Sequence, residues 1–136
     1  MSRLEIEAKV ENLTAVTEFI DGFLEAADCS MKVQMQIDLA VEEIFVNIAN
    51  YAYTPEVGMA AITIDMTPEG KISITFEDSG VPYDPLAKPD PDVTLSASER
   101  AIGGLGIYMV KKSMDDMYYE YRDSKNILTI VKGLSK

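Results

Sequence analysis

Residues 60–76 read AAITIDMTPEGKISITF, and this stretch decides the fold class. Apolar side chains fill every second position on both sides of a central segment, Thr67–Gly70. A period of two is the pattern of a strand that buries one face, and Pro-Glu-Gly between two such runs is the chemistry of a turn. The stretch therefore predicts an antiparallel hairpin with one face in a core.

Two other parts of the chain repeat this alternation. Residues 4–10 alternate apolar with charged or polar side chains and predict a first strand. Residues 117–122 and 127–132 predict a closing pair of strands, because the segment between them, Asp123-Ser124-Lys125-Asn126, consists mostly of residues that favour turns. The chain thus begins and ends in strands.

Apolar residues at helical spacing predict three helices. The first follows Asn12, a residue type that favours the N-cap position. The second begins at Ser30 and runs to about Asn50, with its buried stripe on one side. A short third helix covers Gly106 to about Met114. Between Ser79 and Ile102 the periodicity fails, and a loop of that length is usually functional or mobile.

The order of these elements is β-α-α-β-β-loop-α-β-β. It predicts an α+β fold, a two-layer sandwich with the helices on one face of a mainly antiparallel sheet. The length of 136 residues fits a single domain, 1–136. The lone Cys29 cannot form an internal disulfide, and no leader or apolar run of about 20 residues is visible. We therefore expect a cytoplasmic protein that does not enter the membrane.

The charge and the missing histidine exclude several functions. A formal net charge of −11 argues against direct binding of nucleic acid, which requires Lys and Arg to neutralise phosphates, and favours basic protein partners. For the charge taken alone, an acidic surface that merely keeps the protein in solution is the favoured explanation. With no histidine in the chain, Ser-His-Asp catalysis and His-ligated zinc are impossible, so a carboxylate must serve as any general base.

Glu43 and Asn47 are the first candidate site residues. They lie four residues apart on the second predicted helix, so their side chains project from one face. A carboxylate and an amide oxygen in this arrangement suit Mg²⁺, although such a pair is also typical of a solvated helix surface. Asn50 lies three residues further on and borders the same face, or it simply ends the helix.

Two glycine-containing segments supply the other candidates. Asp78-Ser79-Gly80 follows a predicted strand, where a carboxylate can accept a hydrogen bond from a base; an ordinary turn has the same composition. Gly103-Gly104-Leu105-Gly106 precedes a predicted helix, where free backbone N–H groups and the helix dipole favour phosphate. No Lys-Ser/Thr follows these glycines, so the segment is not a Walker sequence.

Glu43-Ile44-Phe45-Val46-Asn47, Asp78-Ser79-Gly80 and Gly103-Gly104-Leu105-Gly106, in this order, resemble the boxes of the GHKL (histidine kinase-like) ATPase superfamily and its Bergerat-type ATP-binding fold. Over nearly its full length the chain is similar, within that superfamily, to the bacterial anti-sigma-factor serine/threonine kinases. The segments 78–85 and 103–110 are especially close to that subfamily. The resemblance implies ATP and Mg²⁺ as ligands.

The resemblance also implies a role for each matching residue. Asn47 would ligate Mg²⁺, Glu43 would be the general base, and Asp78 would accept the adenine amino hydrogen. Gly80 would leave room for the base. The remaining candidates would surround the phosphates: Gly103, Gly104 and Gly106 through their backbone, Arg100 through its charge, and Asn50 at the border. Relatives often carry histidine where this chain has Tyr51, and a nucleotide contact at Thr129 is doubtful.

The function that follows is an ATP-dependent anti-sigma factor and serine/threonine protein kinase. It would bind a sigma factor and phosphorylate an anti-anti-sigma protein with a STAS domain, and the family suggests a homodimer. The alternative is a nucleotide-dependent binding module that switches partners without transferring phosphate. A sensor histidine kinase is disfavoured, since the chain has no histidine and no dimerisation coil.

Overall fold

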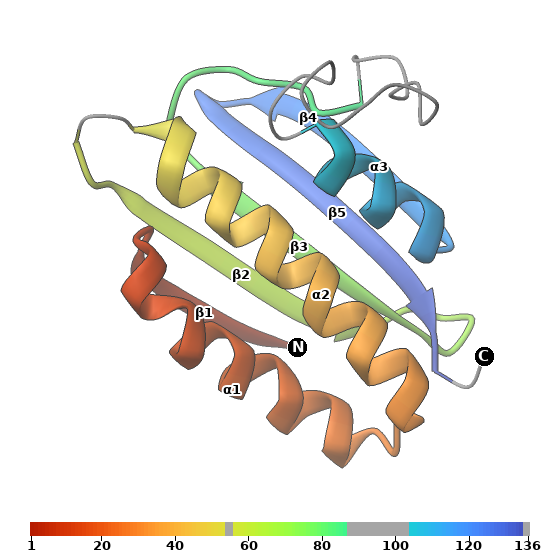
Figure 1. Cartoon of the computed structure of the whole chain (residues 1–136). Coiled ribbons are helices and arrows are strands. Elements are labelled where there is room, and N and C mark those ends of the chain that lie inside the picture. The colour runs from red at the N-terminus through yellow and green to blue at the C-terminus, as the bar shows by residue number, and fades with distance from the viewer. Residues whose placement is uncertain (54–55, 87–103, 135–136) are drawn as a thin grey trace.

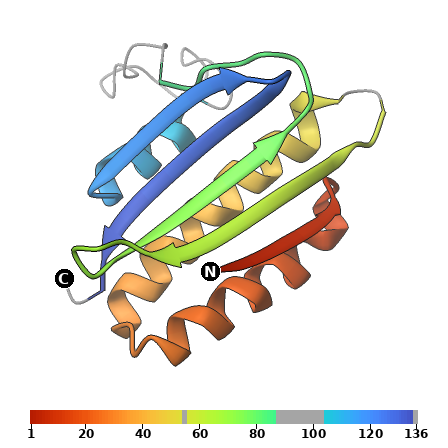
Figure 2. The same ribbon diagram turned by 180° about the vertical axis from the view of Figure 1, so that it is seen from behind.

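The computed structural model describes residues 1–53, 56–86 and 104–134, which form two layers. One layer is a five-stranded antiparallel sheet in the order β1-β2-β3-β5-β4. The helices lie together on one face of this sheet, and the opposite face carries none of them (Figures 1 and 2). The strands are β1 Ser2–Glu7, β2 Met59–Met66, β3 Lys71–Asp78, β4 Asp116–Arg122 and β5 Lys125–Gly133; the α-helices of the described part are α1 Leu13–Ala26, α2 Met31–Asn47 and α3 Gly104–Ser113. The predicted fold class is confirmed.

The hairpin of β2 and β3 forms as its alternation predicts. Ile64 pairs with Ile74 and Ile62 with Phe76, and all four side chains are almost completely buried under the helices. Gly70 closes the turn with a φ of +81°, a left-handed conformation that glycine adopts without steric cost. The hairpin thus supplies the sheet side of the core.

The turn between β4 and β5 is shorter than predicted. Asp123 and Ser124 both have positive φ, 56° and 62°, which is the geometry of a two-residue turn matched to strand twist. Lys125 and Asn126 therefore belong to β5 rather than to the turn. As a result Asn126 lies directly opposite Asp78 of β3.

The helix ends differ in part from the predicted ones. Ser30 caps α2 as expected, its Oγ accepting a hydrogen bond from the Val33 backbone N–H at 3.2 Å. Asn12 makes no capping hydrogen bond; its side chain donates to the Glu7 carbonyl at 2.9 Å. α2 ends at Asn47 and continues as a π-helix, Ile48–Ala52, which contains Asn50. A turn of this wider type often occurs at functional sites.

The core lies between the two layers. Fully buried side chains of α1 and α2, such as Ile20, Leu24, Ile37 and Phe45, pack onto the inward residues of β2, β3 and β5. At about 25 cal/mol per Å² of buried apolar area, this contact between layers is the main stabilising term. No helix within the described ranges has the length and apolar character needed to cross a membrane.

Two carboxylates meet where α1 packs against α2. The inner oxygens (Oδ1) of Asp21 and Asp38 are buried and lack a hydrogen-bond partner among the described residues. Burial is the largest cause that raises the pKa of Asp38, to about 7, and the nearby carboxyl groups of Asp21 and Glu25 raise it further. Asp38 therefore changes its charge close to neutral pH.

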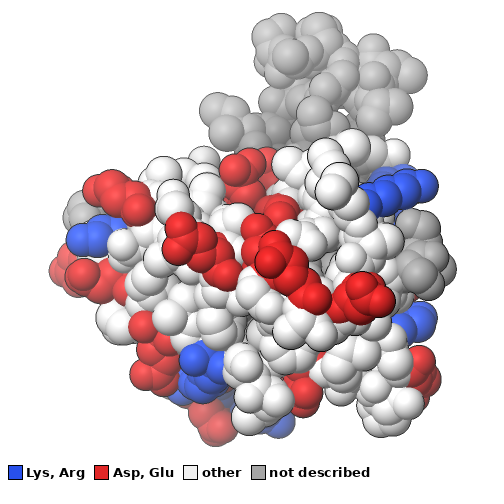
Figure 3. Space-filling view, turned by 90° about the horizontal axis from the view of Figure 1, so that it is seen from below, with Lys and Arg blue, Asp and Glu red and all other residues white. Residues whose placement is uncertain are grey.

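Acidic side chains gather on the side of the molecule where α1 lies. Seen from below in Figure 3, they form a row across this face with few basic side chains among them. Exposed carboxylates in and beside α1 are Glu11, Glu18, Glu25 and Asp28. Such a single-sign surface attracts a basic partner and repels an acidic one.

Candidate functional site

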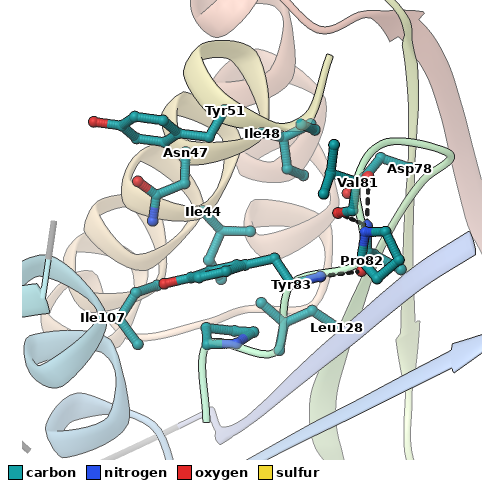
Figure 4. A pocket seen from close by; sticks show the side chains of 13 residues that line it. Ile44, Asn47, Ile48, Tyr51, Asp78, Val81, Pro82, Tyr83, Ile107 and Leu128 are labelled. Atoms are coloured by element: carbon teal, nitrogen blue, oxygen red, sulfur yellow. Dashed lines mark hydrogen bonds between the residues drawn. The ribbon is translucent and has the colours of Figure 1, made fainter. Parts of the chain in front are cut away.

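A pocket of about 500 Å³ lies between the end of α2, the segment after β3 and the start of α3 (Figure 4). A ligand site typically has this size and is mostly apolar with a few placed polar groups. The lining residues are Ile44, Asn47, Ile48, Tyr51, Ala52, Asp78, Val81, Pro82, Tyr83, Pro85, Ile107, Asn126 and Leu128. Two of the predicted site residues, Asn47 and Asp78, are therefore brought together in one hollow.

Asp78 is the buried carboxylate of this pocket. It ends β3 with only 7% of its surface exposed, and its Oδ1 accepts hydrogen bonds from the Gly80 backbone N–H at 3.0 Å and from Asn126 Nδ2 at 2.9 Å. A buried carboxylate costs free energy unless it is hydrogen-bonded, and these donors meet that need. Asp78 is thus held in one orientation at the pocket wall.

Gly80 is required by a close approach of two backbone segments. A Cβ at this position would lie 2.3 Å from the carbonyl oxygen of Ala52, which no real contact allows. The next residue, Val81, donates its backbone N–H to the same carbonyl at 3.0 Å. The Asp78–Val81 loop therefore lies directly against the π-helix that follows Asn47.

Tyr53 links the same two segments through its side chain. Its hydroxyl donates to the Met59 carbonyl at 2.6 Å and accepts from the Ser79 backbone N–H at 2.7 Å. Its ring covers Gly58, where a Cβ would lie only 2.3 Å from a ring carbon. Tyr53 thus links the loop after Asp78 to the first residue of β2.

Glu43 and Asn47 lie one turn apart on α2, both half-buried. Figure 4 shows the Asn47 amide at the edge of the pocket beside Tyr51. Glu43 is not among the lining residues. Its carboxylate instead packs against the first turn of α3, where a Cβ on Gly106 would lie 2.1 Å from Glu43 Oε2. The absence of a side chain at Gly106 makes room for this carboxylate.

The other predicted residues are divided between the described part and the rest. Gly104 begins α3, two residues before the predicted start, and Gly106 lies in its first turn. Asn50 is exposed on the π-helix and does not line the pocket. Arg100 and Gly103 lie outside the described residues, as does most of the predicted loop.

Thr129 lies on the other face of the sheet. Its neighbours in β5, Leu128 and Ile130, point towards the helices, and side chains alternate along a strand. The Thr129 hydroxyl is 3.1 Å from the hydroxyl of Thr75 on β3. Thr129 therefore has a partner away from the pocket.

Asn126 is the site residue that the sequence reasoning missed. It lines the pocket, it is only 7% exposed, and it contacts Asp78 directly. Its position follows from the register of the closing strand pair, because a two-residue turn at 123–124 sets Asn126 opposite Asp78, and the sequence alone does not mark that turn.

Tyr119 of β4 also belongs to this cluster. Its hydroxyl donates to the side-chain carbonyl of Asn126. Burial is the largest effect on this phenol and raises its pKa above the ordinary value, so the hydroxyl stays protonated at neutral pH and remains a donor.

The family of histidine kinase-like ATPase domains matches residues 6–132, almost the entire chain. The chain belongs to this family, and the expectation drawn from its three sequence boxes is confirmed.

Its relatives within the family are distant. A serine/threonine-protein kinase, BtrW of Bordetella bronchiseptica, is 28% identical over 102 residues, which are 74% of this chain and 71% of the relative. The serine-protein kinase RsbW of Bacillus cereus is 25% identical over 92% of this chain and 80% of the relative. An anti-sigma F factor of Clostridium perfringens is 26% identical over 96% of this chain and 93% of the relative.

A solved structure has the same fold. The RsbU and RsbW domains of a Mycobacterium tuberculosis protein match 98% of this chain with a TM-score of 0.66 at 14% sequence identity. The match covers 33% of that longer chain. At this identity the likeness concerns the arrangement of helices and strands.

Proposed function

We propose that this chain binds Mg-ATP in the pocket between α2 and β3 and acts as an anti-sigma factor and serine/threonine protein kinase. The observation that carries the proposal is the meeting of Asn47 and Asp78 in one mostly apolar pocket. The apolar walls suit a flat base, Asp78 suits its amino group, and the amide oxygen of Asn47 suits Mg²⁺. The distant kinase and anti-sigma relatives support this reading.

The chain's own residues would position the nucleotide and accept a proton. Asn47 would hold Mg²⁺, which neutralises phosphate charge during phosphoryl transfer. The start of α3 at Gly104 would offer backbone N–H groups to the phosphates, as helix N-termini do. Glu43 would take the proton from the attacking serine or threonine hydroxyl, while the γ-phosphoryl group passes to that oxygen and ADP leaves.

The phosphate acceptor would be an anti-anti-sigma protein with a STAS domain. This chain would form a homodimer, and the homodimer would bind a sigma factor as its second partner. The acidic face along α1 supports a partner with a basic surface (Figure 3). ATP would then decide which partner is held.

A nucleotide-dependent binding module without phosphate transfer is the second candidate. One observation favours it: the Glu43 carboxylate packs against Gly106 and does not line the pocket. In that case the same pocket would bind nucleotide, and the bound state would control partner affinity alone.

Parallel measurements on Glu43→Gln and Asn47→Ala separate the two candidates. General-base contributions are typically about 10²–10⁴-fold, so Glu43→Gln should lose transfer by about that factor and keep its nucleotide affinity. Asn47→Ala should weaken both, because the metal joins nucleotide and protein. Glu42→Gln, an exposed carboxylate one position away, is the control and should resemble the parent.

The assay is nucleotide affinity by calorimetry together with transfer of labelled phosphate to the STAS partner. A parent that binds Mg-ATP and the partner but transfers nothing supports the binding module. A parent that binds no nucleotide refutes both candidates.

A further inference from the structure

Asn126 uses every hydrogen-bonding position of its side-chain amide. Its Nδ2 donates to Asp78 Oδ1 at 2.9 Å and to the Val81 carbonyl at 3.0 Å. Its Oδ1 accepts from the Tyr83 backbone N–H at 3.0 Å and from the Tyr119 hydroxyl. An asparagine has two amide hydrogens and two carbonyl lone pairs, so all four positions are filled.

This saturation determines how Asp78 presents its carboxylate. Oδ1 accepts from both Asn126 Nδ2 and the Gly80 N–H, and Oδ2 has no protein donor among the described residues. Because Asp78 lines the pocket, the oxygen left for a ligand is Oδ2. Two donors on one oxygen also prevent the carboxylate from exchanging its two oxygens by rotation without breaking both bonds.

The same amide holds the pocket rim. Val81 and Tyr83 follow Asp78 in the chain, and both bond to Asn126 through their backbone. Figure 4 shows the Tyr83 ring extended across the pocket towards Ile107. One buried side chain therefore fixes the carboxylate and the segment beside it.

We propose that Asn126 is a positioning residue for base recognition: it aims Asp78 Oδ2 into the pocket so that the carboxylate accepts a hydrogen bond from the exocyclic amine of adenine. The inference rests on the proposed function, since it concerns the base of the bound nucleotide. The preference for a purine with an exocyclic amine would then depend on the pairing of β3 with β5, because that register places Asn126 opposite Asp78. Asp78 would make the hydrogen bond to the base, and Asn126 would act only by orienting Asp78.

A comparison of ATP with ITP isolates this effect. ITP has a carbonyl oxygen where ATP has the amine, so it offers Asp78 an acceptor in place of a donor. Hydrogen bonds to charged groups contribute more than neutral ones, and a site built for a donor rejects an analogue that lacks it. We expect the parent to bind ATP at least about tenfold more tightly than ITP.

Asn126→Ala removes one of the two hydrogen bonds that orient Asp78, the one from Nδ2, and leaves the bond from the Gly80 N–H. We expect ATP affinity to fall about tenfold, ITP affinity to change less than threefold, and the preference to disappear. Tyr119→Phe is the matched control, because it removes one bond to the Asn126 carbonyl and leaves the bonds to Asp78. That variant should keep the parental ATP-to-ITP ratio even if its melting temperature falls.

The isosteric Asn126→Asp is a second variant, needed if the alanine protein does not fold. It keeps the side-chain volume but replaces the donor that faces Asp78 by a second carboxyl group. Here too the preference for ATP should fall.

Calorimetric affinities for both nucleotides with Mg²⁺, together with melting temperatures, decide the outcome. Equal losses for ATP and ITP would make Asn126 a structural residue only and overturn the inference, as would a variant that keeps the parental ratio. A parent that binds ATP and ITP equally would refute the adenine contact of Asp78 in the proposed function, and the inference with it.

Discussion

Replacing Gly106 by alanine tests the contact between Glu43 and the first turn of α3. The alanine Cβ would lie 2.1 Å from Glu43 Oε2 and 2.8 Å from its Cδ. Non-bonded carbon and oxygen atoms keep a separation of about 3.3 Å, so the carboxylate must move by about 1 Å. The substitution therefore displaces the proposed base without removing it.

The expected loss follows from that displacement. Misplacing a catalytic group by about 1 Å can reduce a rate by about 10²-fold. We expect phosphate transfer by Gly106→Ala to fall by roughly this factor, with nucleotide affinity changed less than about threefold. Stability should not fall, because alanine favours a helix over glycine by about 1 kcal/mol.

Gly22→Ala provides a matched control on α1. It makes the same change in a helix, and its Cβ would meet no atom within 4 Å. It should raise the melting temperature slightly and leave transfer unchanged. Initial rates of transfer from Mg-ATP to the STAS partner, with melting curves for each protein, provide the comparison.

A double-mutant cycle with Glu43→Gln tests whether Gly106 acts through Glu43. If it does, Gly106→Ala should cost little once the base is already gone, because residues that act as a unit are not additive. An effect of Gly106 through Glu43 is refuted if Gly106→Ala transfers phosphate as fast as Gly22→Ala, or if its loss is undiminished in the Glu43→Gln background.

Two further substitutions test the support of the site and the pH dependence of stability. Tyr53→Phe removes the hydroxyl that bonds to the Met59 carbonyl and the Ser79 N–H, so the free energy of unfolding in urea should fall by about 1–3 kcal/mol. Tyr118→Phe, at an exposed tyrosine, is the control and should lose none. Equal stability of the two variants would contradict a supporting role for the Tyr53 hydroxyl. The pKa of Asp38 is raised to about 7, so between about pH 4 and 7 this carboxyl is protonated in the folded state and ionised in the unfolded state. The free energy of unfolding therefore decreases as pH rises through that range. Asp38→Asn should therefore stabilise the protein at pH 8 by about 1 kcal/mol, since partial exposure screens the charges, and hardly at all at pH 4. An equal effect at both pH values in urea titrations would contradict the assignment.

Much of the fold follows from local patterns in the sequence. The alternation around Ile64 and Ile74 determines which face of the hairpin is buried, and Ser30 carries the chemistry of an N-cap. The four-residue spacing of Glu43 and Asn47 is likewise a local property of a helix. These features require no knowledge of distant contacts.

Asn126 could not be placed in this way. Asp123-Ser124-Lys125-Asn126 contains no glycine to mark a two-residue turn, and the positive φ values of Asp123 and Ser124 are seen only in three dimensions. The turn length moves Asn126 from a loop into the strand opposite Asp78. For Gly106 the limit is similar, because its contact with Glu43 depends on how closely two helices approach.

The π-helix after Asn47 limits how the length of this chain can vary. A turn of this kind holds one residue more than an α-helical turn, and each residue adds about 100° of rotation. Deleting one residue from Ile48–Ala52 would give a regular helix and rotate the Ala52 carbonyl and the Tyr53 ring away from the loop they hold. The number of residues between Asn47 and Tyr53 is therefore as much a part of the site as their identities, and an insertion or deletion in this stretch would separate the two halves of the pocket wall.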